Sequence, residues 1–338
     1  MGTNRLRIPR GRFLVLGFGS IGKRHLRNLL KLGVQDVAVF DVRDDRRKEA
    51  SERFSVPAFA DLNLALSSNV KVALICTPTS LHLSNALAAA RAGSHLFIEK
   101  PLSNSLLGVD ELLEEAQQRK LVTLVGCNFR FHVALQRVKG LLEQEVIGKV
   151  ISARAQFGQY LPDWHPWEDY RGSYSAQSAL GGGVILDRIH EFDYLRWLLG
   201  EFQEVYSIAE HLSHLDIDTE DVAEIILRFV NGVIGSLHLD YVRRTYDSSL
   251  EIVGEQGIIQ WSYQKQNVRW YTTDNSMWES KDWPDYDGNE MYLAEMRHFL
   301  KVLVGEEAST QDILSAKRVL EVALATKQSA KQGKSVRL

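Results

Sequence analysis

The chain contains 338 residues, of which 45% are hydrophobic and 25% are charged, which is typical of a globular protein and excludes wholesale disorder. The length suggests about two domains. The formal net charge of −3 argues against the strongly basic surface with which proteins bind nucleic acid non-specifically. Two cysteines, Cys76 and Cys127, are too few for a disulfide framework or a zinc cluster and are interpreted as small core residues.

No stretch approaches the roughly 20 apolar residues of a membrane-spanning helix. The amino-terminal segment 1–12 is short and basic, and neither an apolar core region nor a small-residue cleavage site follows it. We therefore expect a cytoplasmic protein without a membrane partner.

The first half of the chain alternates short apolar runs with helical patterns. Parallel strands need crossover helices, so this alternation predicts an α/β domain with a parallel sheet over residues 1–127. The expected strands are 13–16, 37–40, 70–76, 95–99 and 122–127, and the expected helices are 23–31, 44–54, 81–91 and 105–119.

After residue 127 the pattern changes to strands in series, separated by turn residues. Such a series predicts an α+β domain over residues 128–338, built on a large, mostly antiparallel, open sheet. The expected strands are 150–157, 205–210, 222–229, 233–241, 249–254, 258–263 and 268–272, and the expected helices include 134–145, 291–304 and 312–332.

The sequence Gly-Phe-Gly-Ser-Ile-Gly at 17–22 follows the first expected strand and precedes a helix. In that context it predicts a dinucleotide-binding turn, whose glycines allow a tight bend, close approach of a pyrophosphate and close helix packing. The helix amino-terminus would offer its N–H groups to the phosphates. A purely structural glycine turn is the alternative. The residues expected to bind the cofactor here are Gly17, Gly19, Ser20, Ile21 and Gly22.

Asp41 ends the second expected strand. A carboxylate at this position accepts hydrogen bonds from both hydroxyls of the adenosine ribose and repels a 2′-phosphate, which favours NAD over NADP. Arg43, two residues further on, could instead pair with a 2′-phosphate and leaves NADP open. Asp41 as a cap of the following helix is the structural alternative.

Glu99-Lys100-Pro101 stands at the end of the fourth expected strand. Pro101 restricts Lys100 to an extended backbone, and ligands of α/β proteins bind at the carboxyl ends of parallel strands. A lysine fixed there can hydrogen-bond a substrate hydroxyl and stabilise a developing alkoxide. An ordinary surface lysine is the alternative.

A helix is expected just after the glycine triplet 181–183, and Asp187, His190 and Tyr194 would share one of its faces. Carboxylates three residues before and after His190 could orient it as a general base near neutral pH. The alternative is a capping aspartate beside a buried, hydrogen-bonded histidine.

These motifs, together with Thr77-Pro78-Thr79 and His82, resemble the Gfo/Idh/MocA family of oxidoreductases over nearly the whole chain. The resemblance implies an N-terminal Rossmann domain, hydride transfer between NAD(P) and sugars or polyols, and a catalytic pair of Lys100 and His190 with Asp187 as its polar partner. It also implies a homodimer or homotetramer built through the C-terminal sheet. On the nicotinamide side it implies contacts from Thr77, Pro78, Thr79, His82, Glu99, Lys100 and Asn128.

One departure from the family concerns the interval between Asp187 and His190. In many members the histidine follows the aspartate by four positions, with a glycine between them. In this chain the interval is three positions and the glycine is missing, which affects the expected catalytic orientation of Asp187 more than that of His190. The shorter form and the aromatic stretch 160–170 resemble members encoded with surface-polysaccharide and nonulosonate sugar genes. Aromatic faces with polar tips suit sugars, although an interface arm is the alternative. The implied substrate contacts are Lys100, Arg130, Tyr160, Trp164, His165, Asp187, His190 and Tyr194.

The sequence therefore predicts an oxidoreductase that uses NAD, or alternatively NADP, on a hydroxyl or keto carbon of a sugar, polyol or nucleotide-sugar, without a metal. His190 would take the hydroxyl proton while Lys100 stabilises the oxygen. A keto-sugar or imine reductase, or an NAD(P)-binding sensor, are the alternatives. The presence of both Lys100 and His190 weighs against a sensor, which needs no proton-transfer pair.

Overall fold

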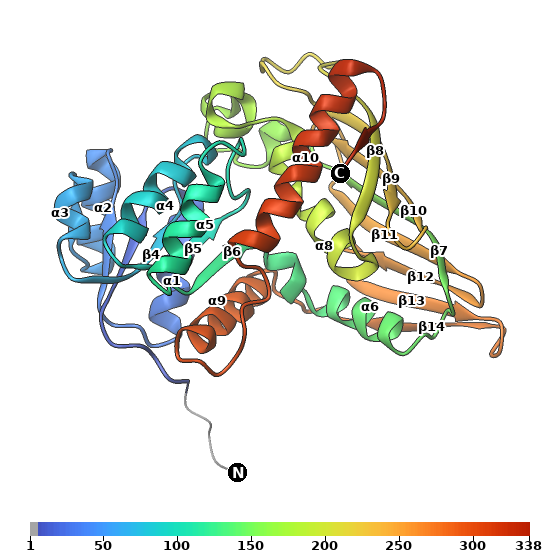
Figure 1. Ribbon diagram of the computed structural model, residues 1–338, viewed down its shortest axis with the longest axis horizontal. Helices are drawn as coiled ribbons and strands as arrows, with labels where there is room; N and C mark the ends of the chain where they lie inside the picture. The colour runs from blue at the N-terminus through green and yellow to red at the C-terminus, as the bar shows by residue number, and fades with distance from the viewer. Residues whose placement is uncertain (1–5) are drawn as a thin grey trace, which may run out of the picture. The chain divides into compact units, whose positions relative to one another are not determined.

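The computed structural model describes residues 6–338 (Figure 1); residues 1–5, part of the amino-terminal segment weighed as an export signal, lie outside the described residues. The chain divides into two compact units. The first holds the residues up to Asn128 together with Met291–Lys317, and the second holds Phe129–Glu290 together with Arg318–Leu338.

The first unit is built on a parallel sheet of six strands. The strands are β1 (Arg12–Leu16), β2 (Val37–Phe40), β3 (Ala58–Phe59), β4 (Val70–Ile75), β5 (His95–Glu99) and β6 (Thr123–Gly126). Their order in the sheet is β3-β2-β1-β4-β5-β6, and every neighbouring pair is parallel. The order reverses between β1 and β4, and open α/β sheets bind ligands at such a point, outside the carboxyl ends of the strands.

Helices cover this sheet because their apolar residues recur on one side, as in α1, where Leu26 and Leu29 are fully buried. The predicted helix at 105–119 is wrong at its start, since α5 begins only after Gly108, which has a φ of +84°. The helices are α1 (Ser20–Lys31), α2 (Asp44–Phe54), α3 (Leu62–Leu66), α4 (His82–Arg91), α5 (Val109–Gln118) and most of α9 (Asn289–Leu303), with a 3-10 turn at η1 (Thr79–Leu81).

The α9 helix corrects the expected domain boundary. Residues 291–317 were assigned to the second domain, but they belong to the first unit. Met296, Phe299 and Leu300 of α9 are fully buried in the same hydrophobic cluster as Phe13 of β1. The first unit is thus completed by a segment that lies far along the chain.

The second unit is built on a sheet of nine strands. The strands are β7 (Val150–Gly158), β8 (Phe202–Glu210), β9 (Val222–Phe229), β10 (Ile234–Asp240), β11 (Asp247–Gly254), β12 (Gly257–Ser262), β13 (Asn267–Thr272), β14 (Met277–Asp282) and β15 (Val336–Arg337). The order is β14-β13-β12-β11-β7-β10-β9-β8-β15. Neighbours are antiparallel, apart from β7 and β10, which are parallel and pair Ala155 with Leu237. The predicted fold class, a parallel sheet followed by a mostly antiparallel open one, is confirmed.

One face of this sheet is covered by helices and the other is not, in the part of the chain that the structure describes (Figure 1). Along β9, Ala223, Ile225 and Leu227 are buried, whereas Ile226 between them is half exposed. The β14 strand escaped sequence analysis because all six of its side chains are exposed, so it has no alternating pattern. The helices and turns are η2 (Asn128–Phe131), α6 (Val133–Glu143), η3 (Leu161–Asp163), η4 (Tyr170–Gly172), η5 (Tyr174–Ala176), η6 (Ser178–Leu180), α7 (Val184–Asp187), α8 (Ile189–Leu199) and most of α10 (Ile313–Gln332).

Candidate functional site

The glycine turn between β1 and α1 contains three glycines with different surroundings. Gly17 has a φ of +92°, and a Cβ on it would lie 2.6 Å from the carbonyl oxygen of Cys76. A Cβ on Gly22 would lie 2.0 Å from the carbonyl oxygen of Gly17, so both positions exclude a side chain. For Gly19 the nearest atom to such a Cβ is a guanidinium nitrogen of Arg46, at 3.8 Å. Packing within the protein therefore does not require a glycine at 19, whereas close approach of a ligand to the backbone would.

The amino-terminus of α1 adds a second feature of a phosphate site. Gly19 is its N-cap residue, no side chain caps the helix, and the first turn, which begins at Ser20 and Ile21, contains no acidic residue. The positive end of the helix dipole is therefore not balanced by a carboxylate in that turn. Helix termini of this kind bind phosphate groups, so the turn fits the pyrophosphate of a dinucleotide.

The Asp41 carboxylate, which is 3% exposed, braces the same turn. It accepts hydrogen bonds from the backbone N–H groups of Phe18 (2.7 Å) and Arg43 (2.9 Å) and from Nη1 of Arg46 (3.3 Å). A carboxylate has about four acceptor positions, which leaves room for a ligand hydroxyl. The Arg43 guanidinium donates to both oxygens of Asp45, at 3.0 and 2.6 Å, and this hydrogen bonding lowers the pKa of Asp45 to about 2. The arginine expected to favour NADP is thus engaged by a carboxylate.

His82 ties two loops of the first unit together. Its Nδ1 lies 2.8 Å from the carbonyl oxygen of Pro101, and its Nε2 lies 2.8 Å from that of Thr77. Burial lowers the pKa of His82, although both carbonyl contacts oppose that effect. Thr79 beside it is 2% exposed. Backbone carbonyls thus lie beside both ring nitrogens of His82, and its expected role as a cofactor contact stays a prediction.

The side chains of Glu99 and Asn128 differ in the hydrogen-bond partners that the protein provides for them. The Glu99 carboxylate turns inward, with Oε1 2.5 Å from Nε2 of His25 and Oε2 accepting a hydrogen bond of 3.2 Å from the backbone N–H of Lys100. Asn128 is 2% exposed, and its Nδ2 finds no acceptor among the described residues. An unsatisfied buried amide is costly, so Asn128 fits a ligand that accepts a hydrogen bond.

In the second unit, Asp187 is held by three hydroxyl groups. Its Oδ1 accepts from Tyr174 (2.5 Å), and its Oδ2 accepts from Ser175 (2.7 Å) and Tyr241 (3.1 Å). The carboxylate is 1% exposed. These donors come from the segment before the glycine triplet and from the residue after β10, so distant parts of the unit fix its position.

The predicted single helix through Asp187, His190 and Tyr194 is wrong. Asp187 ends α7, Arg188 leaves helical geometry with a ψ of 35°, and α8 begins at Ile189. The three side chains therefore do not follow the i, i+3, i+7 spacing of one continuous helix.

His190 and Tyr194 lie on the buried side of α8. His190 is 6% exposed, and its ring centre lies 5.0 Å from that of Phe129. Tyr194 is fully buried, and burial raises the pKa of its hydroxyl well above the usual value, so the hydroxyl keeps its proton. Arg188 packs its guanidinium 3.4 Å from the ring centre of Phe157 and donates to Glu191 at 2.8 Å.

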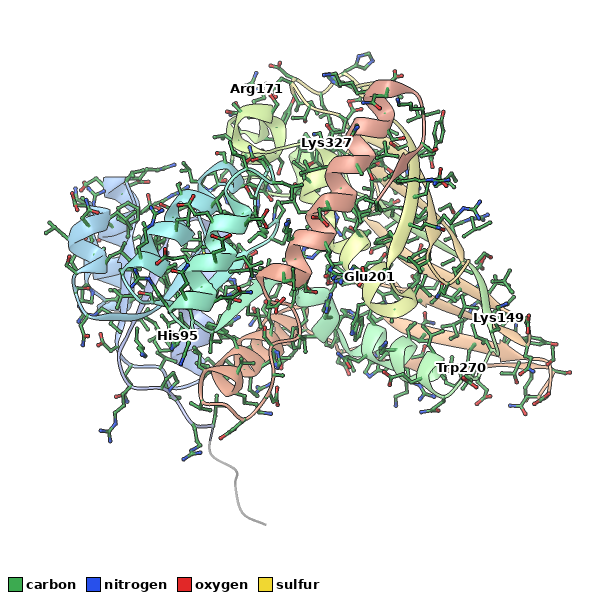
Figure 2. The ribbon with its side chains drawn as sticks, in the orientation of Figure 1. His95, Lys149, Arg171, Glu201, Trp270 and Lys327 are labelled. Carbon is green, nitrogen blue, oxygen red and sulfur yellow. The ribbon has the colours of Figure 1, made fainter. Side chains whose placement is uncertain are left out.

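The glycine triplet at 181–183 makes room for the start of α7. Gly183 has a φ of +102°, and a Cβ on it would lie 2.4 Å from Oε1 of Glu220. That carboxylate accepts from the backbone N–H of Ile185 (3.3 Å) and from Lys327, at 3.2 and 3.0 Å. Lys327 projects from α10 (Figure 2). The helix that ends in Asp187 is therefore anchored at both of its ends.

The other residues expected to contact the substrate pack against, or pair with, side chains of the protein itself. Arg130 forms a buried pair with Asp193, and Tyr160 lies beneath the guanidinium of Arg244 at 3.6 Å. Trp164 packs edge-on against Phe157 and Tyr241, at 6.0 and 5.4 Å between ring centres, and His165 lies 5.5 Å from Trp167. Arg130 and Trp164 thus have packing partners within the second unit, and their expected role as ligand contacts stays a prediction.

Sequence analysis missed the residues that hold the candidate groups. Tyr241 and Glu220 lie more than 30 positions from the residues they support, so no local spacing relates them. His25 sits one helical turn beyond the glycine motif and has no motif of its own. A hydroxyl-rich segment before the glycine triplet, at Tyr174 and Ser175, was the one available signal.

Comparison with known proteins agrees with this architecture. A family model described as the oxidoreductase family with an NAD-binding Rossmann fold matches residues 11–127, and a GFO/IDH/MocA C-terminal domain model matches residues 135–260. Myo-inositol 2-dehydrogenase of Thermotoga maritima is 31% identical, over 96% of this chain and 97% of its own length. The chain belongs to the GFO/IDH/MocA family of oxidoreductases.

Other members of the GFO/IDH/MocA family extend the comparison. Levoglucosan dehydrogenase of Pseudarthrobacter phenanthrenivorans is 28% identical over 59% of this chain and 57% of its own length. A structure of levoglucosan dehydrogenase with NADH and levoglucosan superposes with a TM-score of 0.85 at 22% identity, covering 97% and 98% of the two chains, which shows the shared fold. A probable dehydrogenase of Thermotoga maritima superposes with a TM-score of 0.79 at 29% identity, covering 96% of this chain and 98% of its own.

The family match confirms the predicted Rossmann domain, the oxidoreductase class and NAD as cofactor. Gly19, the uncapped amino-terminus of α1 and the Nδ2 of Asn128 fit a bound dinucleotide independently of that match. No helix within residues 6–338 combines the length and the apolar character needed to cross a lipid bilayer.

Proposed function

We propose that this chain is an NAD-dependent dehydrogenase that oxidises a ring hydroxyl of a cyclic polyol or sugar. The observation that carries the proposal is the end-to-end match to myo-inositol 2-dehydrogenase, at 31% identity over 96% of the chain. Lys100 follows β5 and His190 lies on α8, and the family resemblance implies that these two residues are the catalytic pair. A cationic donor and a neutral base are the two protein groups that oxidation of an alcohol requires.

Residues of the first unit would hold the cofactor. The amino-terminus of α1 with Gly19 suits the pyrophosphate, and the spare acceptor capacity of Asp41 suits the adenosine ribose. Asn128, with its unsatisfied amide, suits a polar group on the nicotinamide side. When bound, the nicotinamide supplies the hydride acceptor. The contacts expected from Thr77, Pro78, Thr79 and Glu99 stay predictions.

The chain's own groups would manage the proton and the developing charge. His190 accepts the proton of the substrate hydroxyl, and Lys100 donates a hydrogen bond to the same oxygen as it becomes negative. Asp187, fixed by three hydroxyl groups, supplies a stationary negative charge in the second unit. The Tyr194 hydroxyl, which keeps its proton, can only stabilise the substrate oxygen or orient His190 and does not act as a base.

A nucleotide-linked sugar, as in the surface-polysaccharide group, is the second candidate substrate. The observation that favours it is the exposed guanidinium of Arg244, stacked at 3.6 Å on Tyr160 at the start of the aromatic stretch. A stacked guanidinium keeps its donor edge free for a phosphate. A free polyol would not need that charge.

The outer face of the second-unit sheet is the proposed interface between copies of the chain, as a dimer or tetramer. Ile226 and Ile234 are 50% and 49% exposed there, beside charged neighbours such as Arg228. Substituting Ile226 by Glu should dissociate the oligomer in analytical ultracentrifugation, whereas a wild-type monomer would contradict the assembly. The cytoplasmic location stays a prediction from the sequence.

The deciding experiment follows the absorbance of reduced nicotinamide. The purified protein receives NAD⁺ or NADP⁺ with inositols, levoglucosan, free sugars and UDP-sugars. We expect turnover with NAD⁺ and a cyclic polyol or sugar. Turnover restricted to UDP-sugars would select the second candidate, and NADH binding without any turnover would contradict the dehydrogenase and favour a sensor.

Two substitutions test the residue roles. Lys100→Ala and His190→Ala should each lower kcat by roughly 10²- to 10⁴-fold, with NADH affinity largely retained. The matched controls are Lys149→Ala and His214→Ala, which change the same residue types at exposed positions. Near-normal rates in both test variants would refute the assignment.

A further inference from the structure

The side chains of His25 and Glu99 form an enclosed pair at the carboxyl end of β5. Nε2 of His25 lies 2.5 Å from Oε1 of Glu99, and the two side chains are 0% and 9% exposed. The His25 ring packs edge-on against Phe97, with 4.9 Å between ring centres. Because His25 lies on α1, the pair joins the helix of the glycine turn to the strand that ends beside Lys100.

The geometry also favours one position for the ring proton of His25. Nδ1 of His25 is buried and has no hydrogen-bond partner among the described residues. A proton on that nitrogen would leave a buried donor unsatisfied, at a cost of about 1–3 kcal/mol. The arrangement therefore favours a proton on Nε2, where it donates to the Glu99 carboxylate.

The Glu99 carboxylate also contacts the backbone of Lys100. The second carboxylate oxygen of Glu99 accepts from the backbone N–H of Lys100 at 3.2 Å. Glu99 and Lys100 also act with opposite sign on the same neighbours, since Glu99 raises and Lys100 lowers the pKa values of His82 and Tyr292. Both charges thus lie within electrostatic range of one another.

The other titratable groups around this carboxylate add little competing charge. Burial raises the pKa of Cys76 well above its usual value, and Glu99 adds to that rise, so the thiol is neutral. The pKa of Tyr292 is likewise raised, mainly by burial, while Arg24 lowers it and Glu295 raises it. Arg24 on α1 and Glu295 on α9 thus act on the pKa of Tyr292 with opposite sign.

We propose that His25 is a positioning residue that holds Glu99 ionised beside Lys100 and thereby keeps Lys100 cationic during the reaction. The inference rests on the proposed role of Lys100 and extends it to a residue outside the family motifs. A carboxylate near an ammonium group favours its charged form and typically moves its titration by about one to three pH units. Loss of that carboxylate should therefore let Lys100 deprotonate at lower pH.

Three variants test this role. Glu99→Gln removes the charge, and His25→Leu removes the donor, so that a buried carboxylate without its donor takes up a proton. In both, the alkaline limb of the kcat/KM profile should move to lower pH by about one unit or more. His25→Gln retains an N–H donor for Glu99 and should restore the wild-type limb. NADH affinity should change less than threefold in His25→Leu and His25→Gln, which separates the role of His25 from cofactor binding.

A second readout needs no turnover. The pH at which Lys100 becomes reactive toward an amine-acylating reagent, followed by peptide mass spectrometry, should fall in Glu99→Gln and His25→Leu but not in His25→Gln. Unchanged Lys100 reactivity in the first two variants would overturn the inference, whether or not a substrate has been found. In wild-type protein, ¹⁵N NMR should show a proton on Nε2 of His25, and an Nε2 without a proton would also overturn the inference.

Discussion

Arg130 and Asp193 form a two-pronged ion pair inside the second unit, with both N–O distances at 2.8 Å. The side chains are 7% and 1% exposed. Asp193 lies on α8 and Arg130 lies on η2, so the pair fixes the helix of His190 to the segment that follows β6. The arginine that the sequence suggested as a sugar ligand is therefore held in place by a buried carboxylate.

Substituting one residue of this ion pair should lower the stability of the fold far more than expected from substituting both residues together. Asp193→Asn or Arg130→Met leaves one buried charge unpaired and should lower the free energy of unfolding by about 3–5 kcal/mol. The double variant should lose less than the sum of the two single variants, as urea unfolding can measure. Equal and additive small losses would show that the pair contributes little.

The glycine triplet offers a prediction with an internal control. Gly183→Ala places a Cβ 2.4 Å from the Glu220 carboxylate at a φ of +102°. We expect a loss on the order of 2 kcal/mol in unfolding free energy, together with reduced kcat, because the start of α7 must shift. Gly172→Ala, where a Cβ would meet nothing within 4 Å, should change neither quantity. Thermal unfolding and the standard assay compare the two.

His132 should make the protein sensitive to acid. Burial lowers the pKa of His132 to about 4, and its Nδ1 accepts the N-cap hydrogen bond from Ala134 at 3.2 Å. A histidine whose pKa is lower in the folded state stabilises the fold above its unfolded pKa of about 6.5, and this stabilisation is lost as the pH falls.

The loss expected from His132 between pH 7 and pH 4 is about 3 kcal/mol. His132→Asn keeps a capping acceptor but does not titrate, so its unfolding free energy should fall less over that range. Urea unfolding at several pH values measures the difference. If the unfolding free energies of the two proteins changed with pH in parallel, His132 would not be the cause of the loss of stability in acid.

Asp41 should determine the choice of cofactor. Asp41→Asn keeps an acceptor for the Phe18 N–H but removes the charge that repels a 2′-phosphate. We expect the ratio of kcat/KM for NAD⁺ to that for NADP⁺ to fall by about tenfold, equivalent to about 1.4 kcal/mol. Asp36→Asn makes the same charge change at an exposed pair with Arg12 and should leave the ratio unchanged.

The sheets could be predicted from the sequence because each has a simple pattern. Buried parallel strands such as Val37–Phe40 are continuous apolar runs, and half-buried strands such as Val222–Phe229 alternate. The β14 strand has neither pattern, and β3 is only two residues long. Pairing of β7 with β10 joins strands about 80 positions apart, which no local spacing reveals.

The site was predictable only where a motif fixes the backbone. The glycine turn and Lys100 stand at the ends of strands, so the sheet places them. The sequence alone did not reveal the packing partners of Arg130 and Trp164, because a polar or aromatic side chain in a loop suits packing as well as binding. Which role it takes depends on partners, such as Asp193 and Tyr241, that are brought near only by the fold.

The placement of α9 in the first unit has a consequence for biosynthesis. Met296, Phe299 and Leu300 complete the core around Phe13, so a nascent chain that has emerged only to residue 128 lacks part of its first hydrophobic core. The ribosome must therefore synthesise residues 129–290 of the second unit before the core of the first unit can be completed. A fragment ending at Asn128 should therefore be recovered in inclusion bodies, and a circular permutant that joins 291–317 directly to the first strand should not.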